Sequence, residues 1–286
     1  MWCEAGSVRR RIFRPPASIP MSQPEQQEKA VIEAREGVVG FFDILGYGSY
    51  LKNDPDVRSK QALQVLLKIK DEVPGRIRKR VPRALVDNLS WTIFSDSVLL
   101  TMPCSGTRDK QAVESDQGKR WLTFLLSSVI LLDHMFDRGL PIRGAITFGR
   151  YFCHENCLAG GAVVEAHELE QRINLSGVVL HDSAKEELGR LTPESFKSGD
   201  GIYVYNILLD YLVAEKGASK KRLVLNQWAL SDKHDNNEDI AQLTAEAFWK
   251  HGKDIDDGAA QKLRNTEMLL RFVVATKREL RSQRSV

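Results

Sequence analysis

Asp43 is the residue whose surroundings most strongly indicate chemistry. It lies within the apolar run Val38 to Gly48, VVGFFDILGYG, which is typical of a strand buried on both faces. An unpaired carboxylate inside such a strand is costly, so a cationic group must meet it. A second carboxylate, Asp96, lies in a two-residue turn between two strand-like runs. If this turn lies beside the end of the first strand, the two carboxylates converge.

Two converging carboxylates and a backbone carbonyl would form an all-oxygen site. No histidine or cysteine is near them in sequence, so the site suits Mg²⁺ or Mn²⁺ and not zinc. The segment Leu45-Gly46-Tyr47-Gly48-Ser49 follows Asp43 directly, and its glycines let backbone amides approach an anion closely. Hard metals and phosphate occur together in nucleoside triphosphates, so the sequence favours such a substrate.

Arg143 and Arg150 flank a later strand and are candidates for binding the triphosphate, because a guanidinium offers fixed donors to phosphate. Simpler interpretations compete. Asp96 could be only a turn former, and a buried salt bridge to Arg143 would satisfy Asp43 without any metal. Either arginine could also form a surface ion pair. The residues Cys153, His154 and Cys157 have metal-ligand chemistry, but without a second pair this is a weak zinc signal.

The elements that must position these residues follow from apolar periodicity and turn signals. Strands are expected at Val38 to Gly48, Ala84 to Phe94, Ser97 to Met102, Pro141 to Phe148, Gly177 to His181 and Ile202 to Leu209. Helices are expected at Val57 to Val73, Lys119 to Phe136, Gly160 to Arg172 and Ser183 to Leu188. The order β-α-β-β-α-β predicts an α+β fold with a ferredoxin-like antiparallel sheet and helices on one face.

Three regions are expected along the chain. Residues 1–36, rich in arginine, proline and glutamine, predict a flexible N-terminal arm. Residues 37–208 form the main domain, and residues 209–286 add a C-terminal extension of strand and helices packed on it. Within this extension we expect a turn at Lys216 to Arg222, a strand at Leu223 to Trp228, and helices at Glu238 to His251 and Gln261 to Leu280.

Composition excludes several classes of protein. The chain has 286 residues, 42% hydrophobic and 28% charged, which is ordinary for a folded globular protein. A net charge of +3 is too small to indicate a nucleic-acid partner. No apolar stretch is long enough for a membrane span. Four scattered cysteines and the lack of a signal peptide indicate a cytoplasmic protein.

Three segments together resemble the class III nucleotide cyclases, over roughly Val38 to Leu188. FFDILGYGSYL is similar to the first metal-binding strand of that family, FSDSVLL to its hairpin with the second aspartate, and LPIRGAITFG to a later strand. The resemblance implies that Asp43 and Asp96, with the main-chain carbonyl of Ile44, bind two Mn²⁺ or Mg²⁺ ions. It also implies that the amides from Leu45 to Ser49 hold phosphates, that residues 37–208 are the catalytic domain, and that a homodimer forms composite sites.

The sequence departs from the purine-specific members of the family. Thr92 stands where those enzymes carry a lysine that reads adenine or an acidic residue that reads guanine. Val164 and Glu168 stand where the family has an asparagine and an arginine that orient ribose and stabilise the transition state. Tyr50 could narrow the base pocket together with Phe41 and Trp91, although packing at a helix start explains it equally well. These departures are similar to the pyrimidine cyclases of the Pycsar anti-phage defence system.

The expected reaction is therefore conversion of UTP to 3′,5′-cyclic UMP and pyrophosphate, a second-messenger signal read by a downstream effector. Cyclic CMP, AMP or GMP as product is the nearest alternative. A catalytically dead module that binds a nucleotide and a partner is another, because the asparagine and arginine are missing. A nucleotidyl transferase is a third, since polymerase palms share this topology.

Overall fold

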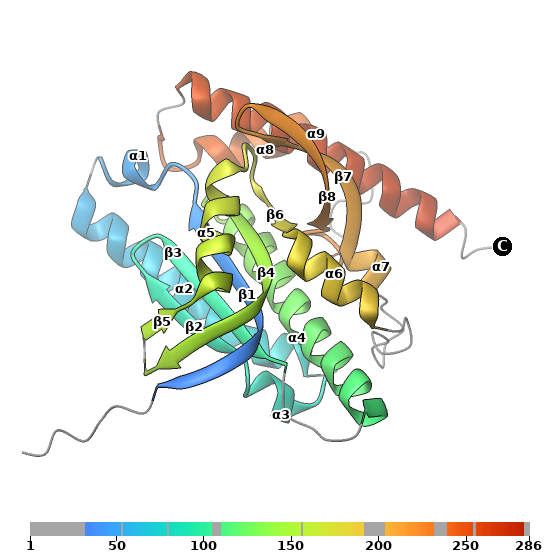
Figure 1. Ribbon diagram of the computed structural model, residues 1–286. Coiled ribbons are helices and arrows are strands. Elements are labelled where there is room, and N and C mark those ends of the chain that lie inside the picture. The colour runs from blue at the N-terminus through green and yellow to red at the C-terminus, as the bar shows by residue number, and fades with distance from the viewer. Residues whose placement is uncertain are drawn as a thin grey trace, which may run out of the picture. The chain divides into compact units, whose positions relative to one another are not determined.

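A single eight-stranded sheet organises the protein, with strand order β2-β3-β1-β4-β6-β8-β7 and β5 paired to β4 (Figure 1). The computed structural model describes residues 32–52, 54–78, 80–104, 110–155, 157–191, 204–231, 239–253 and 256–282. The strands are β1 (Glu33–Ile44), β2 (Ser90–Phe94), β3 (Ser97–Pro103), β4 (Ile142–His154), β5 (Cys157–Ala159), β6 (Gly177–Leu180), β7 (Leu208–Glu215) and β8 (Ala218–Leu225). The helices are α1 (Tyr47–Leu51), α2 (Pro55–Ile77), α3 (Arg83–Val86), α4 (Lys110–Asp137), α5 (Gly161–Arg172), α6 (Asp182–Arg190), α7 (Val204–Ile207), α8 (Ile240–Trp249) and α9 (Asp257–Ser282).

Strand β1 lies in the interior of the sheet, antiparallel to both β3 and β4. Its side chains alternate between the two faces, as in any strand. Val38, Phe42 and Ile44 face the core that α2 and α4 cover, whereas Val39 packs with residues of α5 on the opposite face. Because both faces are covered, β1 is a nearly continuous apolar run.

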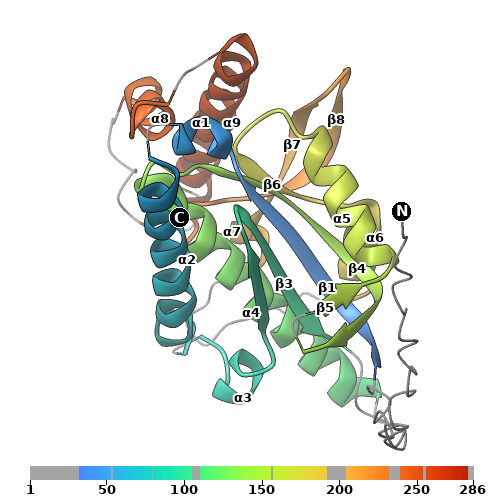
Figure 2. The same ribbon diagram turned by 90° about the vertical axis from the view of Figure 1, so that its left-hand side faces the viewer.

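Helices α2 and α4 pack on one face of the ferredoxin-like part, β1-α2-β2-β3-α4-β4, as the sequence predicts (Figure 2). The α+β class is confirmed. The sheet is mixed, because β4 and β6 pair in parallel. Helix α5 lies on the opposite face from α2, over β1 and β4, and α9 packs on the same side as α5 over β6, β7 and β8. Helices therefore cover parts of both faces of the whole sheet.

Strand β2 and helix α2 differ from the expectation based on the sequence. The predicted strand Ala84 to Phe94 forms strand only from Ser90, because helix α3 takes its first residues, which include the good helix formers Ala84 and Leu85. Helix α2 continues past the expected stop at Pro74 to Ile77. Val73 and Ile77 are buried and anchor the last turns of this helix, whose other buried positions are Ala62, Leu66 and Ile69.

The C-terminal extension differs more. The predicted strand Ile202 to Leu209 is helix α7 from Val204 and then the start of β7, while residues 201–203 lie outside the described residues. The predicted turn Lys216 to Arg222 is mostly strand β8, and the reversal occurs at Gly217, whose φ is +88°. Lysines 220 and 221 are exposed on this outer hairpin, and they mask the strand pattern in the sequence.

The predicted N-terminal arm, residues 1–36, falls largely outside the described residues. Within its last part, strand β1 begins at Glu33 and pairs with β4 from Cys153 onward. Residues from Ile32 onward group into one compact unit. Among the described helices, none is long and apolar enough to cross a membrane.

Packing against Phe42 makes Gly144 a sensitive position. A Cβ at Gly144 would lie 2.6 Å from Cδ1 of Phe42 and 2.9 Å from the carbonyl oxygen of Phe41. Gly144→Ala should therefore lower the free energy of unfolding by about 1–3 kcal/mol, the usual cost of overpacking, in urea titrations. The control is Gly189→Ala in α6, where no atom lies within 4 Å of the new Cβ. A Gly144→Ala protein as stable as the control would contradict this account.

Candidate active site

Register places Asp43 at the end of β1, opposite Ser97 of β3 and Arg143 of β4. Its side chain faces the same side of the sheet as Val39 and Phe41, which is the α5 side. The Ser97 hydroxyl donates a hydrogen bond of 3.5 Å to Oδ1 of Asp43. The Asp43 side chain is 22% exposed, so its carboxylate is largely buried but still reachable from solvent.

Asp96 meets the end of β1 through the backbone. The turn between β2 and β3 consists of Ser95, with a φ of +54°, and Asp96. The N–H of Ile44 donates to the carbonyl oxygen of Asp96 over 3.1 Å. Since Ser97 is the register partner of Asp43, the turn holds the Asp96 carboxylate close enough for its charge to act on Asp43. The structure thus brings together the two carboxylates singled out in the sequence.

A third carboxylate, Glu170 of α5, joins this cluster, and sequence reasoning missed it. Its side chain is 2% exposed and accepts a hydrogen bond from Nε of Arg143. Arg143 also donates to the carbonyl oxygen of Ile173 and lies 3.7 Å from Oδ2 of Asp43. The helical spacing of the sequence could have placed Glu170 on the buried side of α5, because it follows Ala162 and Ala166 at four-residue steps.

Burial and negative neighbours raise the pKa of Asp43 to about 6. Desolvation is the largest cause, followed by the charges of Glu170 and Asp96, and these outweigh the opposing influence of Arg143. Desolvation likewise raises the pKa of Glu170. The salt bridge to Arg143, one of the two sequence interpretations of Asp43, is therefore present but does not compensate the carboxylate fully.

The glycine-containing turn begins directly after Asp43 and Ile44. Gly46 adopts a left-handed φ of 71° and precedes α1. The Leu45 N–H donates to the carbonyl oxygen of Pro141 over 2.9 Å, so that amide is already used within the protein. The first hydrogen bond of α1 runs from the Tyr50 N–H to the Gly46 carbonyl oxygen. The amides of Tyr47 and Gly48 precede it and have no partner within the helix.

The residues proposed for a base pocket do not all lie together. Phe41 lies on the site face, the face of the sheet that carries the Asp43 side chain, and its ring centroid is 4.7 Å from that of His167. Phe41 on β1 pairs with Leu99 on β3, which pairs with Thr92 on β2, so Thr92 lies on the same face. Tyr50 is 2% exposed and packs in the core on α2, with its hydroxyl 3.4 Å from Oε1 of Gln61. Trp91 also packs against the α2 and α4 core.

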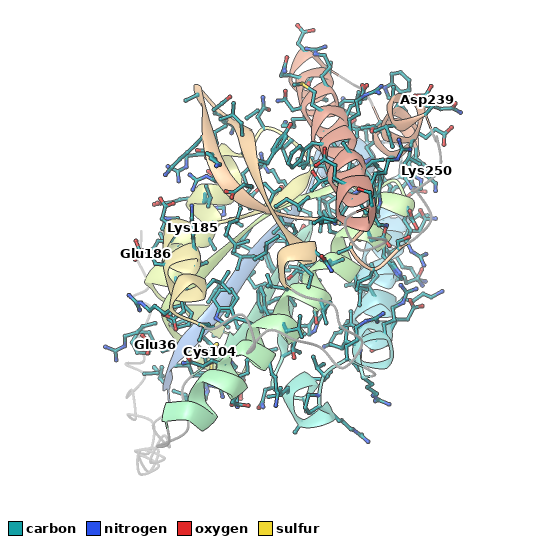
Figure 3. All side chains as sticks on the ribbon, turned by 90° about the vertical axis from the view of Figure 1, so that its right-hand side faces the viewer. Glu36, Cys104, Lys185, Glu186, Asp239 and Lys250 are labelled. Carbon is teal, nitrogen blue, oxygen red and sulfur yellow. The ribbon has the colours of Figure 1, made fainter. Side chains whose placement is uncertain are left out.

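Arg150 lies at the other end of the sheet from Asp43. Arg150 follows Arg143 by seven positions on β4, and its register partner on β1 is Glu36. Figure 3 shows Glu36 and Cys104 at one end of the sheet and Lys250, the residue after α8, toward the other. Arg150 is exposed at this far end, so the structure does not bring it to the carboxylate cluster.

The remaining sequence candidates lie on surfaces. Cys153 and His154 belong to the β4–β5 hairpin, in which His154 pairs with Cys157. Within the described residues no group of three histidine, cysteine or acidic side chains could hold a metal ion. Val164 is 54% exposed, and Glu168 is also exposed on α5.

The carboxylate cluster nonetheless fits a divalent cation. Mg²⁺ commonly binds proteins through one or two carboxylates, and waters and substrate phosphates complete its coordination. Asp43 and Asp96 would offer two such oxygen ligands, and Arg143 compensates the charge of Asp43 only in part. An arrangement of oxygen donors alone excludes the soft ligand sets of structural zinc.

Comparison with known proteins gave matches among solved structures only. No family model and no curated protein matches the chain. The adenylyl cyclase CyaB from P. aeruginosa is 13% identical, with 68% of this chain and 94% of that chain covered and a TM-score of 0.40. A class III adenylyl cyclase-like ATP-binding protein from Pseudomonas aeruginosa is 15% identical, with 58% and 37% covered and a TM-score of 0.40.

The monomeric guanylyl cyclase domain of the RhoGC fusion protein from the aquatic fungus Blastocladiella emersonii is 16% identical, with 56% and 88% covered and a TM-score of 0.37. The described residues of this chain form an α+β fold with a mixed sheet. The placement of each site residue rests on register and contacts within this chain.

Removing the Asp43 charge should stabilise the protein in the absence of divalent ions. The folded pKa of about 6 exceeds the ordinary 3.8, so this carboxyl contributes stability at low pH that is lost as the pH rises through about 6. Asp43→Asn avoids that loss. Its melting temperature should exceed that of wild type above pH 6 and approach it near pH 4.

Asp182→Asn serves as the control of opposite sign. The hydrogen bond from Lys220 lowers the pKa of Asp182, so its carboxylate contributes stability above its ordinary pKa. The Asp182→Asn protein should lose stability at neutral pH and not at low pH. An Asp43→Asn protein that melts below wild type at neutral pH would contradict the electrostatic analysis of the cluster.

Proposed function

We propose that this protein is a pyrimidine nucleotide cyclase that converts UTP to 3′,5′-cyclic UMP and pyrophosphate. The observation that carries the proposal is the meeting of Asp43 and Asp96 at the end of β1, directly before the glycine-containing turn. The Asp43 carboxylate for a hard cation and the amides for an anion thus follow each other within a few residues, and the β2–β3 turn adds Asp96. A metal–triphosphate complex requires this combination.

In this proposal Asp43, Asp96 and the main-chain carbonyl of Ile44 hold two Mn²⁺ or Mg²⁺ ions. When bound, such ions activate the attacking 3′ hydroxyl and stabilise the leaving pyrophosphate. The turn from Leu45 to Ser49 orients the phosphates, with the left-handed Gly46 aiming the chain into α1. The 3′ oxygen bonds to the α-phosphorus, the bond to the bridging oxygen of pyrophosphate breaks, and one proton is released.

The choice of UTP rests on the site face of the sheet. Thr92 lies there across Leu99 from Phe41, and a threonine hydroxyl can donate or accept a single hydrogen bond. The lysine or acidic residue that purine cyclases carry at this position is absent from the sequence. Tyr50 is buried on the other side of the sheet, so we assign the base pocket to Phe41 and Thr92.

A homodimer with composite sites is part of the proposal. Helix α5 covers β1 and β4, while Phe94 at the end of β2 is 77% exposed. Val164 of α5 is also exposed, as expected of a surface that meets a second copy. The partner would then complete the site with groups that one chain lacks.

The resemblance to the Pycsar enzymes extends the proposal to signalling. In that role cyclic UMP acts as a second messenger in anti-phage defence, and a downstream effector meets this protein only through the product. Neither nucleic acid nor membrane takes part.

One observation favours a second function, a nucleotide-binding module without turnover. Neither Val164 nor Glu168 can replace the amide and guanidinium that the family uses on the transition state. Arg143 is engaged by Glu170 and is therefore not available for that task in this chain. Binding without consumption of nucleotide would be the signature of such a module.

Loss of either metal-binding carboxylate should abolish turnover. Purified protein is incubated with Mn²⁺ and, separately, ATP, GTP, CTP or UTP, and products are identified by chromatography and mass spectrometry. We expect a cyclic monophosphate from UTP, and at most about 1% of that rate in Asp43→Ala and Asp96→Ala, a loss of the order of electrostatic transition-state stabilisation. Both variants should remain folded dimers.

Asp210→Ala on the exposed side of β7 is the matched control and should keep the wild-type rate. Near-normal turnover in either site variant would refute the metal assignment. Binding of nucleotide without any product in wild type would make the non-catalytic module the better description. A product joining two nucleotides would indicate a nucleotidyl transferase.

Base choice should depend on Thr92 and not on Tyr50. Thr92→Lys should lower the preference for UTP over ATP, because its ammonium projects from the site face toward the base. Tyr50→Ala should mainly destabilise, by about 3 kcal/mol as for other buried aromatics, with the ratio of products from the four nucleotides unchanged. A changed ratio in Tyr50→Ala would return this tyrosine to the base pocket.

A further inference from the structure

The proposed triphosphate site lacks a cation from the residues that the sequence suggested. Arg143 is held by Glu170 and the carbonyl oxygen of Ile173, and Arg150 lies at the far end of β4. A triphosphate carries several negative charges, which backbone amides alone compensate poorly. Within this chain, positive side chains close to the turn from Leu45 to Ser49 come from another part of the fold.

A cavity of about 230 Å³ lies against this turn. It is smaller than the pockets of drug-sized ligands and suits a compact group such as a di- or triphosphate. Figures 1 and 2 both place α1 beside α8 and α9 of the C-terminal extension. The lining residues are Leu45, Gly46 and Ser49 from the turn, and Phe248, Lys253, Asp256, Ala259 and Lys262 from the extension.

Lys253 is the unusual member of this lining. It is 8% exposed, and its Nζ has no hydrogen-bond partner among the described residues. A Cβ built on Gly46 would lie 3.7 Å from Cδ of Lys253, so the lysine stem runs along the glycine turn. Burial lowers the pKa of Lys253 to about 8. A buried ammonium that no described residue pairs is costly unless a ligand supplies the counter-charge.

The fold holds Lys253 in this place. After α8 the chain reverses through two left-handed residues, His251 with φ +75° and Gly252 with φ +64°. Nε2 of His251 lies 2.8 Å from the carbonyl oxygen of Arg138. The His251 ring packs edge-on against the Tyr50 ring, with 5.3 Å between the ring centroids. A non-glycine residue in this conformation persists only where its surroundings fix it.

Lys262 of α9 brings a second positive charge toward the carboxylates. Burial is the main cause that lowers the pKa of Lys262. The charge of Arg143 lowers this pKa further, whereas the charge of Asp43 raises it. Helix α9 is fixed beside β6, because the N–H of Ser176 donates to Oγ1 of Thr266 over 2.7 Å. Among the described residues that line the cavity, Asp256 carries the one carboxylate, and its Oδ1 accepts the N–H of Ala259.

We infer that Lys253 and Lys262 of the C-terminal extension bind the terminal phosphates of the nucleotide in the cavity against Gly46. This assignment deepens the proposed function and rests on it. It gives the extension a role in the site of its own chain, opposite the cation-binding carboxylates of β1 and the β2–β3 turn.

Inorganic tripolyphosphate is the probe, titrated calorimetrically into the full chain in the presence of Mn²⁺. Lys253→Met and Lys262→Met keep most of the aliphatic stem and remove the charge. Each should raise Kd about tenfold or more, the order expected for one charge-assisted hydrogen bond. Arg264→Met is the matched control, because Arg264 is exposed on the same helix and outside the cavity lining; its Kd should equal that of wild type.

Melting temperatures of the same variants without the probe identify a folding defect. Lys253→Met should be at least as stable as wild type, since it loses a buried charge that no described residue pairs. Wild-type Kd values in both lysine variants, or no tripolyphosphate binding by wild type, would overturn the inference. UTP turnover separates it from the proposed function: lysine-dependent binding without turnover refutes only the cyclase, whereas turnover with lysine-independent binding refutes only this site.

Discussion

The site depends on one electrostatic constraint, the burial of Asp43 among other carboxylates in the interior of the sheet. Strands β3 and β4 on either side of β1 fix the backbone at this position, so Asp43 cannot withdraw to water. Arg143 lies beside it but is shared with Glu170 and Ile173. The negative charge that remains is a cost to the fold, and carboxyls with a pKa raised in this way cluster at functional sites.

Opposite charges are arranged on two sides of the glycine turn. The carboxylates come from the sheet and α5, whereas Lys253 and Lys262 come from the extension. A ligand that is itself a cation joined to an anion would compensate both sides at once. Free metal or free phosphate would meet only one of them, which favours a metal–phosphate complex over either component.

Sequence reasoning could find the part of the site that local patterns encode. An aspartate in an apolar strand and glycines directly after it are visible without a structure, and the ferredoxin-like strand order predicts that the Asp96 turn lies beside Asp43. Contacts between distant segments are not encoded in this way. The helical spacing of Glu170 places it on the buried stripe of α5, but only packing shows that it holds Arg143.

The same limit explains the errors in the extension and in the base pocket. Exposed lysines hid strand β8, since its outer face alternates less clearly than a core strand. Tyr50 follows the glycine turn closely in sequence, yet α1 rotates it into the core on α2. Lys253 carries no motif at all, and its importance arises from the left-handed reversal that returns the chain to Gly46.

The contact between Lys253 and Gly46 joins residues about 200 positions apart. A ribosome adds about 5–20 residues per second, and domains begin to fold as they emerge. Strands β1, β3 and β4 can therefore pair while the segment from α8 onward is still unmade. The lysine side of the cavity is completed last, so a nascent or truncated chain would hold the carboxylates without the lysines that face them.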